Sequence, residues 1–287
     1  MRKSFEAVVV IVTIVLVVIA IQKVVKEKRE KEMAAEEEIQ NEELAKEIDI
    51  FEYHNCGGKF SLKKEKKHDI FFYRVQNNDN LTTIVDKIKK SCGPKFEYLN
   101  YREYQGVFGF NIPGTVIHPG FLLAIPIEKS KRITSKEKFL DEADEAIEEM
   151  KKTPKYGKRF SGFMKTVSKE DVKRSAYAYA MAESELGVYA LNRWEKKYKA
   201  YSFSYFHVLM GKGNPGFTAR MNLRLSEGDV ILSPKNSVKL FIAYWLEKDK
   251  KSEECLALSP SNIQKCGTQY NGGTEYHPKL KEFYNKY

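Results

Sequence analysis

One glutamate in this 287-residue chain is placed where acid–base chemistry is feasible. Ser168 and Asp171 have the spacing of a capping box, so a helix is predicted to begin there, and Gly187 supplies its stop. Glu183 continues the apolar stripe of that helix, which consists of Val172, Ala176, Tyr179 and Ala180. A carboxylate on a core-facing stripe is either paired or held neutral, and a neutral one can donate a proton. On spacing alone, a partly exposed structural glutamate at a helix end is the more frequent outcome.

The composition is that of a globular protein with a basic folded part. Hydrophobic residues make up 42% of the chain. The net charge of the whole chain is +10, and that of residues 51–287 taken alone is +13. This charge favours an acidic partner, such as nucleic acid, anionic lipid or an acidic wall polymer. The basic residues are scattered without a nucleic-acid motif, so we expect no nucleic-acid partner. The glycine-rich loop at 211–217 lacks the Lys-Ser/Thr of a phosphate loop, and no cofactor is expected.

The four cysteines fall in two separated pairs, Cys56 with Cys92 and Cys255 with Cys266. None forms a C-x-x-C or has a histidine at metal-ligand spacing, so no metal site is expected. Outside the cytoplasm such cysteines are usually oxidised, and we expect these two pairs to form disulfides. Four cysteines allow three connectivities, and free thiols remain an alternative.

An apolar run near the N-terminus predicts export. Residues 7–21 are unbroken by charge, and the span reaches the length of a bilayer crossing. We predict a transmembrane anchor over 1–25 and a helical stalk over 26–50, with the globular domains on the periplasmic or extracellular side of the cytoplasmic (inner) membrane. A cleaved signal peptide and a coiled-coil stalk are the alternatives. Basic residues after the span favour the reverse orientation, whereas the cysteines favour the outer side.

Residues 51–130 show short apolar runs separated by turn signals. Strands are predicted over Phe71–Val75 and Phe121–Ile127. Between them, Asn77–Asn80 predicts a turn and helix cap, and the stripe that begins at Leu81 predicts a helix.

This segment resembles the LysM module. Its opening matches Tyr73-Arg74-Val75, Asn78-Asp79-Asn80-Leu81 and Ile84, and its closing Pro-Gly-x-x-Leu-x-Ile-Pro matches 119–126. The resemblance implies a βααβ module that binds N-acetylglucosamine polymers such as peptidoglycan. The groove residues that it implies are Asn78, Asp79, Asn80, Leu81, Ile117 and Pro119. A module that only scaffolds and binds no glycan is the alternative.

Residues 131–165 are predicted to link this module to the rest of the chain. Positions 135–152 predict an acidic helix with one apolar face, and Thr153-Pro154 ends it. Because of that face, the helix is expected to pack on the C-terminal domain.

Four short motifs follow one another between Val172 and Tyr287. They are Ala182-Glu183-Ser184, the segment from Ser204 to Met210, Pro234-Lys235-Asn236 with Tyr244-Trp245-Leu246, and Tyr270-Asn271-Gly272-Gly273. In this order they resemble the lytic transglycosylase domain, a relative of goose-type lysozyme. The resemblance implies an all-α, lysozyme-like domain over 166–287. The chain departs from the family at His207, where glutamine is usual.

The resemblance also implies a reaction. Glu183, with a pKa raised by burial, would protonate the oxygen between N-acetylmuramic acid and N-acetylglucosamine. Its carboxylate would then take a proton from the C6 hydroxyl, which attacks C1 and gives a 1,6-anhydro product. Tyr270 would orient Glu183 or the sugar. The other cleft residues that the resemblance implies are Ser184, His207, Met210 and Asn271.

Hydrolytic glycosidases usually need a second carboxylate. The candidates are Glu195, Glu227 and Asp229, and the sequence does not place any of them opposite Glu183. A hydrolytic muramidase therefore stays an alternative.

The predicted fold class is α+β: an N-terminal transmembrane helix, a βααβ LysM-like module and an all-α catalytic domain. The predicted function is that of a membrane-anchored peptidoglycan lytic transglycosylase, whose partners are peptidoglycan and the membrane. A catalytically silent, peptidoglycan-binding scaffold of a larger envelope assembly is the alternative from another functional class.

Overall fold

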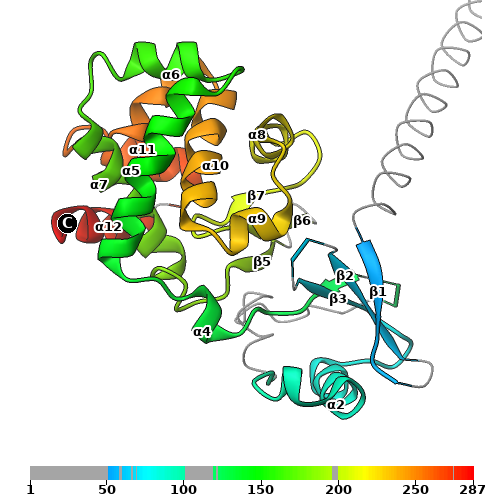
Figure 1. The fold of residues 1–287 in the computed structure, drawn as a ribbon. Coiled ribbons are helices and arrows are strands. Elements are labelled where there is room, and N and C mark those ends of the chain that lie inside the picture. The colour runs from blue at the N-terminus through cyan, green and yellow to red at the C-terminus, as the bar shows by residue number, and fades with distance from the viewer. Residues whose placement is uncertain are drawn as a thin grey trace, which may run out of the picture. The chain divides into compact units, whose positions relative to one another are not determined.

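Within the described residues, a four-stranded sheet with one α-helix is followed by a larger group of helices and a second, three-stranded sheet (Figure 1). The computed structural model describes residues 51–57, 60–65, 67–68, 70–100, 119–120, 122–195, 200–273 and 275–287. Within it, residues Tyr53–Tyr287 form one compact unit.

The first part contains β1 (Phe51–Asn55), β2 (Ser61–Glu65), β3 (Phe71–Arg74), α2 (Leu81–Cys92), the 3₁₀ helix η1 (Gly93–Phe96) and β4 (Leu122–Ala124). The second part begins with α4 (Lys129–Arg132), α5 (Lys136–Lys152), α6 (Gly157–Phe163) and α7 (Lys169–Ser184). It continues with β5 (Asn192–Glu195), β6 (Ala200–Phe203), β7 (Val208–Leu209), α8 (Pro215–Leu223) and α9 (Glu227–Ile231). It ends with α10 (Pro234–Glu247), η2 (Lys250–Leu256), α11 (Ile263–Asn271) and α12 (Tyr276–Asn285).

Strands β1 to β4 lie side by side in chain order. Strand β3 pairs antiparallel with β2 and with β4, where Tyr73 lies opposite Leu123. The two predicted strands are confirmed as β3 and β4, but the βααβ layout is wrong in omitting β1 and β2. In β2 the buried positions alternate poorly and include Glu65, so the apolar pattern that marks a strand is missing. Among the described residues between α2 and β4, the second helix of the predicted layout has no α-helical counterpart, and only the 3₁₀ helix η1 follows α2.

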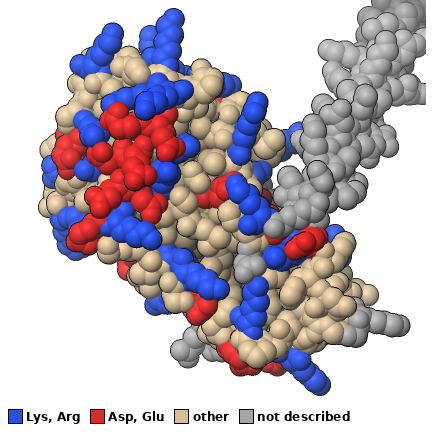
Figure 2. Space-filling model, in the orientation of Figure 1, with Lys and Arg blue, Asp and Glu red and all other residues tan. Residues whose placement is uncertain are grey.

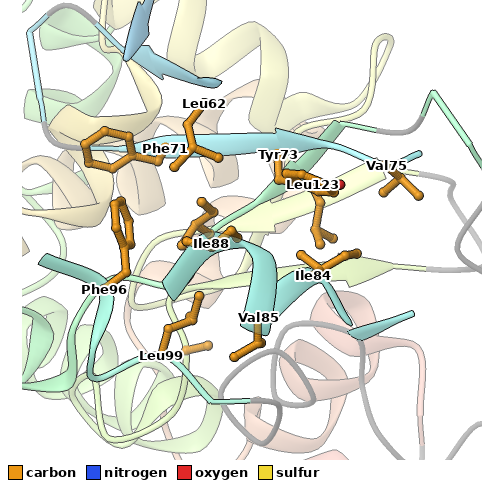
Figure 3. Close-up of a cluster of buried hydrophobic side chains, with 12 residues drawn as sticks. Leu62, Phe71, Tyr73, Val75, Ile84, Val85, Ile88, Phe96, Leu99 and Leu123 are labelled. Carbon is orange, nitrogen blue, oxygen red and sulfur yellow. The ribbon is translucent and has the colours of Figure 1, made fainter. Parts of the chain in front are cut away.

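Helix α2 closes the core of this first part (Figure 3). The predicted cap is confirmed: Asn80 Oδ1 accepts the Thr83 N–H at 2.9 Å, and Thr83 Oγ1 accepts the Asn80 N–H. The Cys56–Cys92 disulfide, one of the two predicted pairs, joins the chain after β1 to the last residue of α2. The buried core consists of Leu62, Phe71, Tyr73, Val75, Ile84, Val85, Ile88, Phe96, Leu99, Leu123 and Ile125.

Helix α5 packs against both α7 and α10, and the three helices form the centre of the second part. The predicted helix starts are confirmed, because Ser135 and Ser168 cap α5 and α7 through their hydroxyls. The expected packing of the acidic helix α5 on the C-terminal helices is also confirmed. Between α7 and α10, the rings of Tyr179 and Phe241 lie 5.1 Å apart, so aromatic side chains fill this core.

The acidic face of α5 is matched by lysines. Figure 2 shows acidic side chains gathered over this helix, with basic side chains at their border. Asp144 pairs with Lys169 of α7 at 2.9 Å, and Glu149 pairs with Lys239 of α10 at 2.9 Å. These exposed pairs each contribute little to stability, but they leave this face without an unbalanced acidic surface.

The prediction of an all-α C-terminal domain is wrong. Strands β5, β6 and β7 form an antiparallel sheet in that order, with Arg193 opposite Ser202 and Phe203 opposite Val208. The segment is rich in aromatic residues, which favour strands. The family resemblance, rather than this local composition, led to the all-α expectation.

The predicted transmembrane anchor over 1–25 stays a prediction. Among the described residues, no helix is both long enough and apolar enough to cross a membrane. The apolar run at 7–21 and the predicted stalk at 26–50 lie outside the described residues.

Candidate active site

The end of α7 is fixed by an unusual turn. Helix α7 ends with Glu183 and Ser184, and the next three residues, Glu185, Leu186 and Gly187, all have positive φ angles of 47°, 53° and 92°. A Cβ on Gly187 would come within 2.1 Å of the Arg132 carbonyl oxygen, so only glycine fits. Arg132 Nε donates a hydrogen bond to the Gly187 carbonyl at 3.0 Å, which ties this turn to α4.

Glu183 is buried and faces His207. The two residues are 7% and 8% exposed, and Glu183 Oε2 lies 3.1 Å from His207 Nδ1. His207 Nε2 lies 2.8 Å from the carbonyl oxygen of Ala190. His207 comes from the turn between β6 and β7 and has a φ of 46°, a backbone conformation that often marks functional sites.

These contacts fix how many protons the pair holds. A backbone carbonyl only accepts hydrogen bonds, so His207 Nε2 must donate its hydrogen to Ala190. His207 Nδ1 and Glu183 Oε2 then need one further proton between them, because without it two lone pairs would face each other at 3.1 Å. The pair is therefore either imidazolium with carboxylate or neutral imidazole with carboxylic acid, and it holds one transferable proton in both forms.

The expected rise in the pKa of Glu183 is wrong in direction. Burial alone would raise this pKa, but the hydrogen bond and charge of His207, together with the charge of Arg193, hold it below its ordinary value. This direction favours the carboxylate form of Glu183. The correction arises because His207, at the position where the resemblance implies glutamine, is itself a base.

Arg193 connects Glu183 to a second carboxylate. Its Nη2 lies 3.6 Å from Glu183 Oε2, while its Nε donates to Glu195 Oε1 at 2.7 Å. Glu195 Oε1 also accepts the Ser202 hydroxyl at 2.9 Å. Strand β5 carries both Arg193 and Glu195, and pairing with β6 brings Ser202 beside them. One guanidinium thus holds the two glutamates at the same site.

Tyr270 supports the His207 segment rather than Glu183. Its hydroxyl donates to the carbonyl oxygen of Phe206, the residue before His207. Its ring lies 4.8 Å from that of Tyr179 and is stacked 6.0 Å from that of Tyr276. Burial, followed by the nearby charge of Glu183, raises the pKa values of the Tyr270 and Tyr276 phenols well above their ordinary range. Both phenols are therefore neutral beside the Glu183–His207 pair.

One cleft, with a volume of about 260 Å³, lies over this arrangement. Four of the predicted site residues line it together: Glu183, His207, Tyr270 and Asn271. It has further lining residues that the predicted site did not contain: Arg193, Glu195, Val208, Leu209, Asn214, Pro215, Tyr244, Lys248 and Gln269. Its volume lies just below the roughly 300–1,000 Å³ common for ligand pockets.

Ser184 and Met210 are not among the residues that line this cleft. Ser184 is fully buried, and its hydroxyl donates to the carbonyl oxygen of Tyr205 at 2.9 Å. Ser184 therefore anchors the start of the β6–β7 turn to the end of α7. Met210 is 8% exposed, and its N–H donates to the Tyr201 carbonyl within the small sheet. Both residues therefore support the site without lining the cleft.

Of the three candidate second carboxylates, only Glu195 lines the cleft. Asp229, in α9, instead accepts hydrogen bonds from Lys67 at 2.6 Å and pairs with His68 at 3.0 Å. Glu227 is the first residue of that same helix. The signal that could have found Glu195 is its place on a strand two residues after Arg193, since alternate strand residues share a face.

The predicted glycan groove of the first part does not join this cleft. Asn78 is exposed in a left-handed turn, and Leu81 is half-buried at the start of α2. Asp79 has no exposed side-chain surface, and its carboxylate accepts the Tyr73 hydroxyl at 2.7 Å and pairs with Lys87. Asp79 therefore holds the turn together and presents nothing to a ligand. Ile117 lies outside the described residues.

The described residues contain no group of three His, Cys, Asp or Glu side chains that could hold a metal ion.

The second predicted disulfide, Cys255–Cys266, is confirmed and joins η2 to α11, the helix that carries Tyr270. Comparison with known proteins gives no match among family models, curated proteins or solved structures.

Proposed function

We propose that this chain is a peptidoglycan lytic transglycosylase in which Glu183 is the catalytic acid. The observation that carries the proposal is the single cleft lined by Glu183, His207, Tyr270 and Asn271, residues about 90 positions apart in the sequence at their extremes. A buried carboxyl group with one transferable proton is what cleavage of a glycosidic bond requires.

The proposed reaction uses the shared proton at its first step. Glu183 delivers that proton to the glycosidic oxygen, and the bond from C1 of the muramoyl sugar to that oxygen breaks. The C6 hydroxyl oxygen of the same sugar bonds to C1, and the Glu183 carboxylate takes the hydroxyl proton. The pair thus ends with one proton, as it began, and no water is consumed.

The two disulfides support a location outside the cytoplasm, because such bonds persist in oxidising compartments. Peptidoglycan lies in such a compartment, which is why we propose it as the partner.

Replacement of Glu183 by glutamine tests this function. Glutamine keeps the size of the side chain and a hydrogen bond to His207 but cannot transfer a proton, so release of anhydro-muropeptides should fall by at least about 100-fold. Mass spectrometry of digested peptidoglycan measures the release. Glu170→Gln, in the first turn of the same helix, is the matched control. Unchanged release in Glu183→Gln would remove the catalytic role, and no release by the parent protein would favour the silent scaffold.

Glu195 favours one second candidate, a hydrolytic muramidase. Because Glu195 lines the same cleft, it could activate a water molecule on the other face of the sugar. Hydrolysis would give a reducing end that is heavier than the anhydro product by the mass of one water. Glu195→Gln should abolish that heavier product and spare the anhydro product, so the two reactions are separable in one mass spectrum.

A further inference from the structure

Lys248 is a cleft residue that the reaction above does not use. It follows α10 directly, and its Nζ donates to the Gln269 carbonyl oxygen at 2.7 Å. The same ammonium lies 4.9 Å from the ring centre of Tyr244 and 4.7 Å from that of Trp245. Aromatic faces stabilise a cation without neutralising it. Among the described residues no carboxylate forms an ion pair with Lys248, although the charge of the neighbouring Asp249 acts to raise its pKa.

The other charges in the cleft cancel. The Glu183–His207 pair holds one proton and is neutral overall, and Arg193 balances Glu195. Among the charged side chains that line the cleft, Lys248 is the one left over. Its unbalanced positive charge therefore gives the cleft an electrostatic preference for an anionic ligand.

The ammonium group of Lys248 can also donate further hydrogen bonds. An ammonium has three N–H donors, and one of them goes to Gln269. Partial burial lowers the pKa of Lys248, which means that the charged form lacks part of the solvation it would have in water. An anion that replaces this lost solvation would be bound by a charge-assisted hydrogen bond.

We propose that Lys248 binds a carboxylate of the glycan and so selects an acidic wall polymer over a neutral polymer of N-acetylglucosamine. This inference rests on the proposed function for the identity of the sugar chain. The carboxylate could belong to the lactyl group of a muramoyl sugar without a peptide, or to a peptide attached to that group. Both sources present the same chemistry to Lys248.

The test compares three glycans of the same length. The first carries free lactyl carboxylates, the second carries peptides on its lactyl groups, and the third has its lactyl carboxylates converted to neutral methylamides. Binding is measured by titration calorimetry in a Glu183→Gln background, where no cleavage occurs, and cleavage is measured separately with Glu183 present. Lys248→Met removes the charge, Lys248→Arg keeps it, and Lys250→Gln alters an exposed neighbouring lysine as the control.

We expect Lys248→Met to weaken binding of the carboxylate glycan about tenfold and to leave binding of the methylamide unchanged. Lys248→Arg should restore most of the preference. A loss in the first glycan alone identifies the lactyl carboxylate as the ligand, and a loss confined to the second identifies the peptide.

An equal loss for all three glycans would overturn the inference, because it would mean that Lys248 only caps the last turn of α11. Failure of the proposed function has a different signature. If the parent protein cleaves nothing but its binding still depends on Lys248 and on the carboxylate, the reaction is wrong and the binding role stands.

Discussion

His207 Nδ1 lies 3.1 Å from Glu183 Oε2, while the other nitrogen of the same ring is committed to the Ala190 carbonyl. The proposed acid of this site is therefore the pair and not the glutamate alone. The proton count of such a coupled pair is a property of both groups together. A proton shared by the two residues can be delivered through the glutamate, because the two atoms are within hydrogen-bond distance.

His207→Gln should raise the pKa of Glu183. The substitution removes the hydrogen bond and the charge that lower this pKa, and the effect of burial then prevails. A lowered pKa in the folded protein stabilises it above pH 4.5, the ordinary value for the group, and this stabilisation is lost as the pH falls through the folded-state pKa. The difference in free energy of unfolding between parent and variant should therefore shrink as the pH is lowered from 7 to 3.

Urea denaturation at several pH values measures that difference, and carboxyl ¹³C chemical shifts of Glu183 follow its protonation directly. Cleavage should persist in His207→Gln, because burial then keeps the proton on Glu183 itself. A Glu183 pKa that stays low in the variant would contradict this account and would assign the effect to Arg193.

The helices were predictable because their signals are local. Ser135 and Ser168 cap α5 and α7 as their positions indicate, and the stripe of each helix faces the core. The turn before α2 follows from Asn80 in the same way. Caps and stripes involve residues within one or two turns of each other, so one stretch of sequence contains both partners.

The chemistry of the site was not predictable because its partners are distant in sequence. The pKa of Glu183 depends on His207, 24 residues further on, and on the strand residue Arg193. The sequence placed Glu183 on a buried face, from which a raised pKa follows only if no base lies opposite. Likewise, Glu195 joins the cleft through strand pairing, which helical periodicity does not reveal.

Gly187→Ala should destabilise the protein and disturb Glu183. A methyl group at this position meets the Arg132 carbonyl, and the φ of 92° is strained for any residue with a Cβ. We expect a loss of at least about 2 kcal/mol in the free energy of unfolding, together with a loss of cleavage. Gly162→Ala, in α6 with open space around its Cβ position, should instead stabilise by about 0.5–1 kcal/mol. Equal effects from the two substitutions in thermal denaturation would show that the turn after α7 is not constrained.

Arg193 and Glu195 should be energetically coupled. Arg193→Met leaves Glu195 without its cation, whereas the double variant with Glu195→Gln removes both charges. Both side chains are partly exposed, so we expect a coupling of about 0.5–1 kcal/mol from the four free energies of unfolding. Arg193→Met should also raise the pKa of Glu183, because the guanidinium charge lowers it. Additive free energies would mean that the bridge between the two glutamates makes no net contribution.

The two disulfides should differ in their effect on cleavage. Cys56–Cys92 and Cys255–Cys266 close loops with separations of 36 and 11 residues, for which chain entropy predicts stabilisation of about 4 and about 3 kcal/mol. Both double serine variants should therefore melt at lower temperatures.

Only Cys255–Cys266 lies against the cleft wall, because Cys266 belongs to α11, which also carries Gln269, Tyr270 and Asn271. At a temperature where both variants are folded, serine at 255 and 266 should lower cleavage, and serine at 56 and 92 should leave the cleft intact. Product release at that temperature, with circular dichroism to confirm folding, distinguishes the two. An equal loss in both variants would indicate that α11 is held in place without its disulfide.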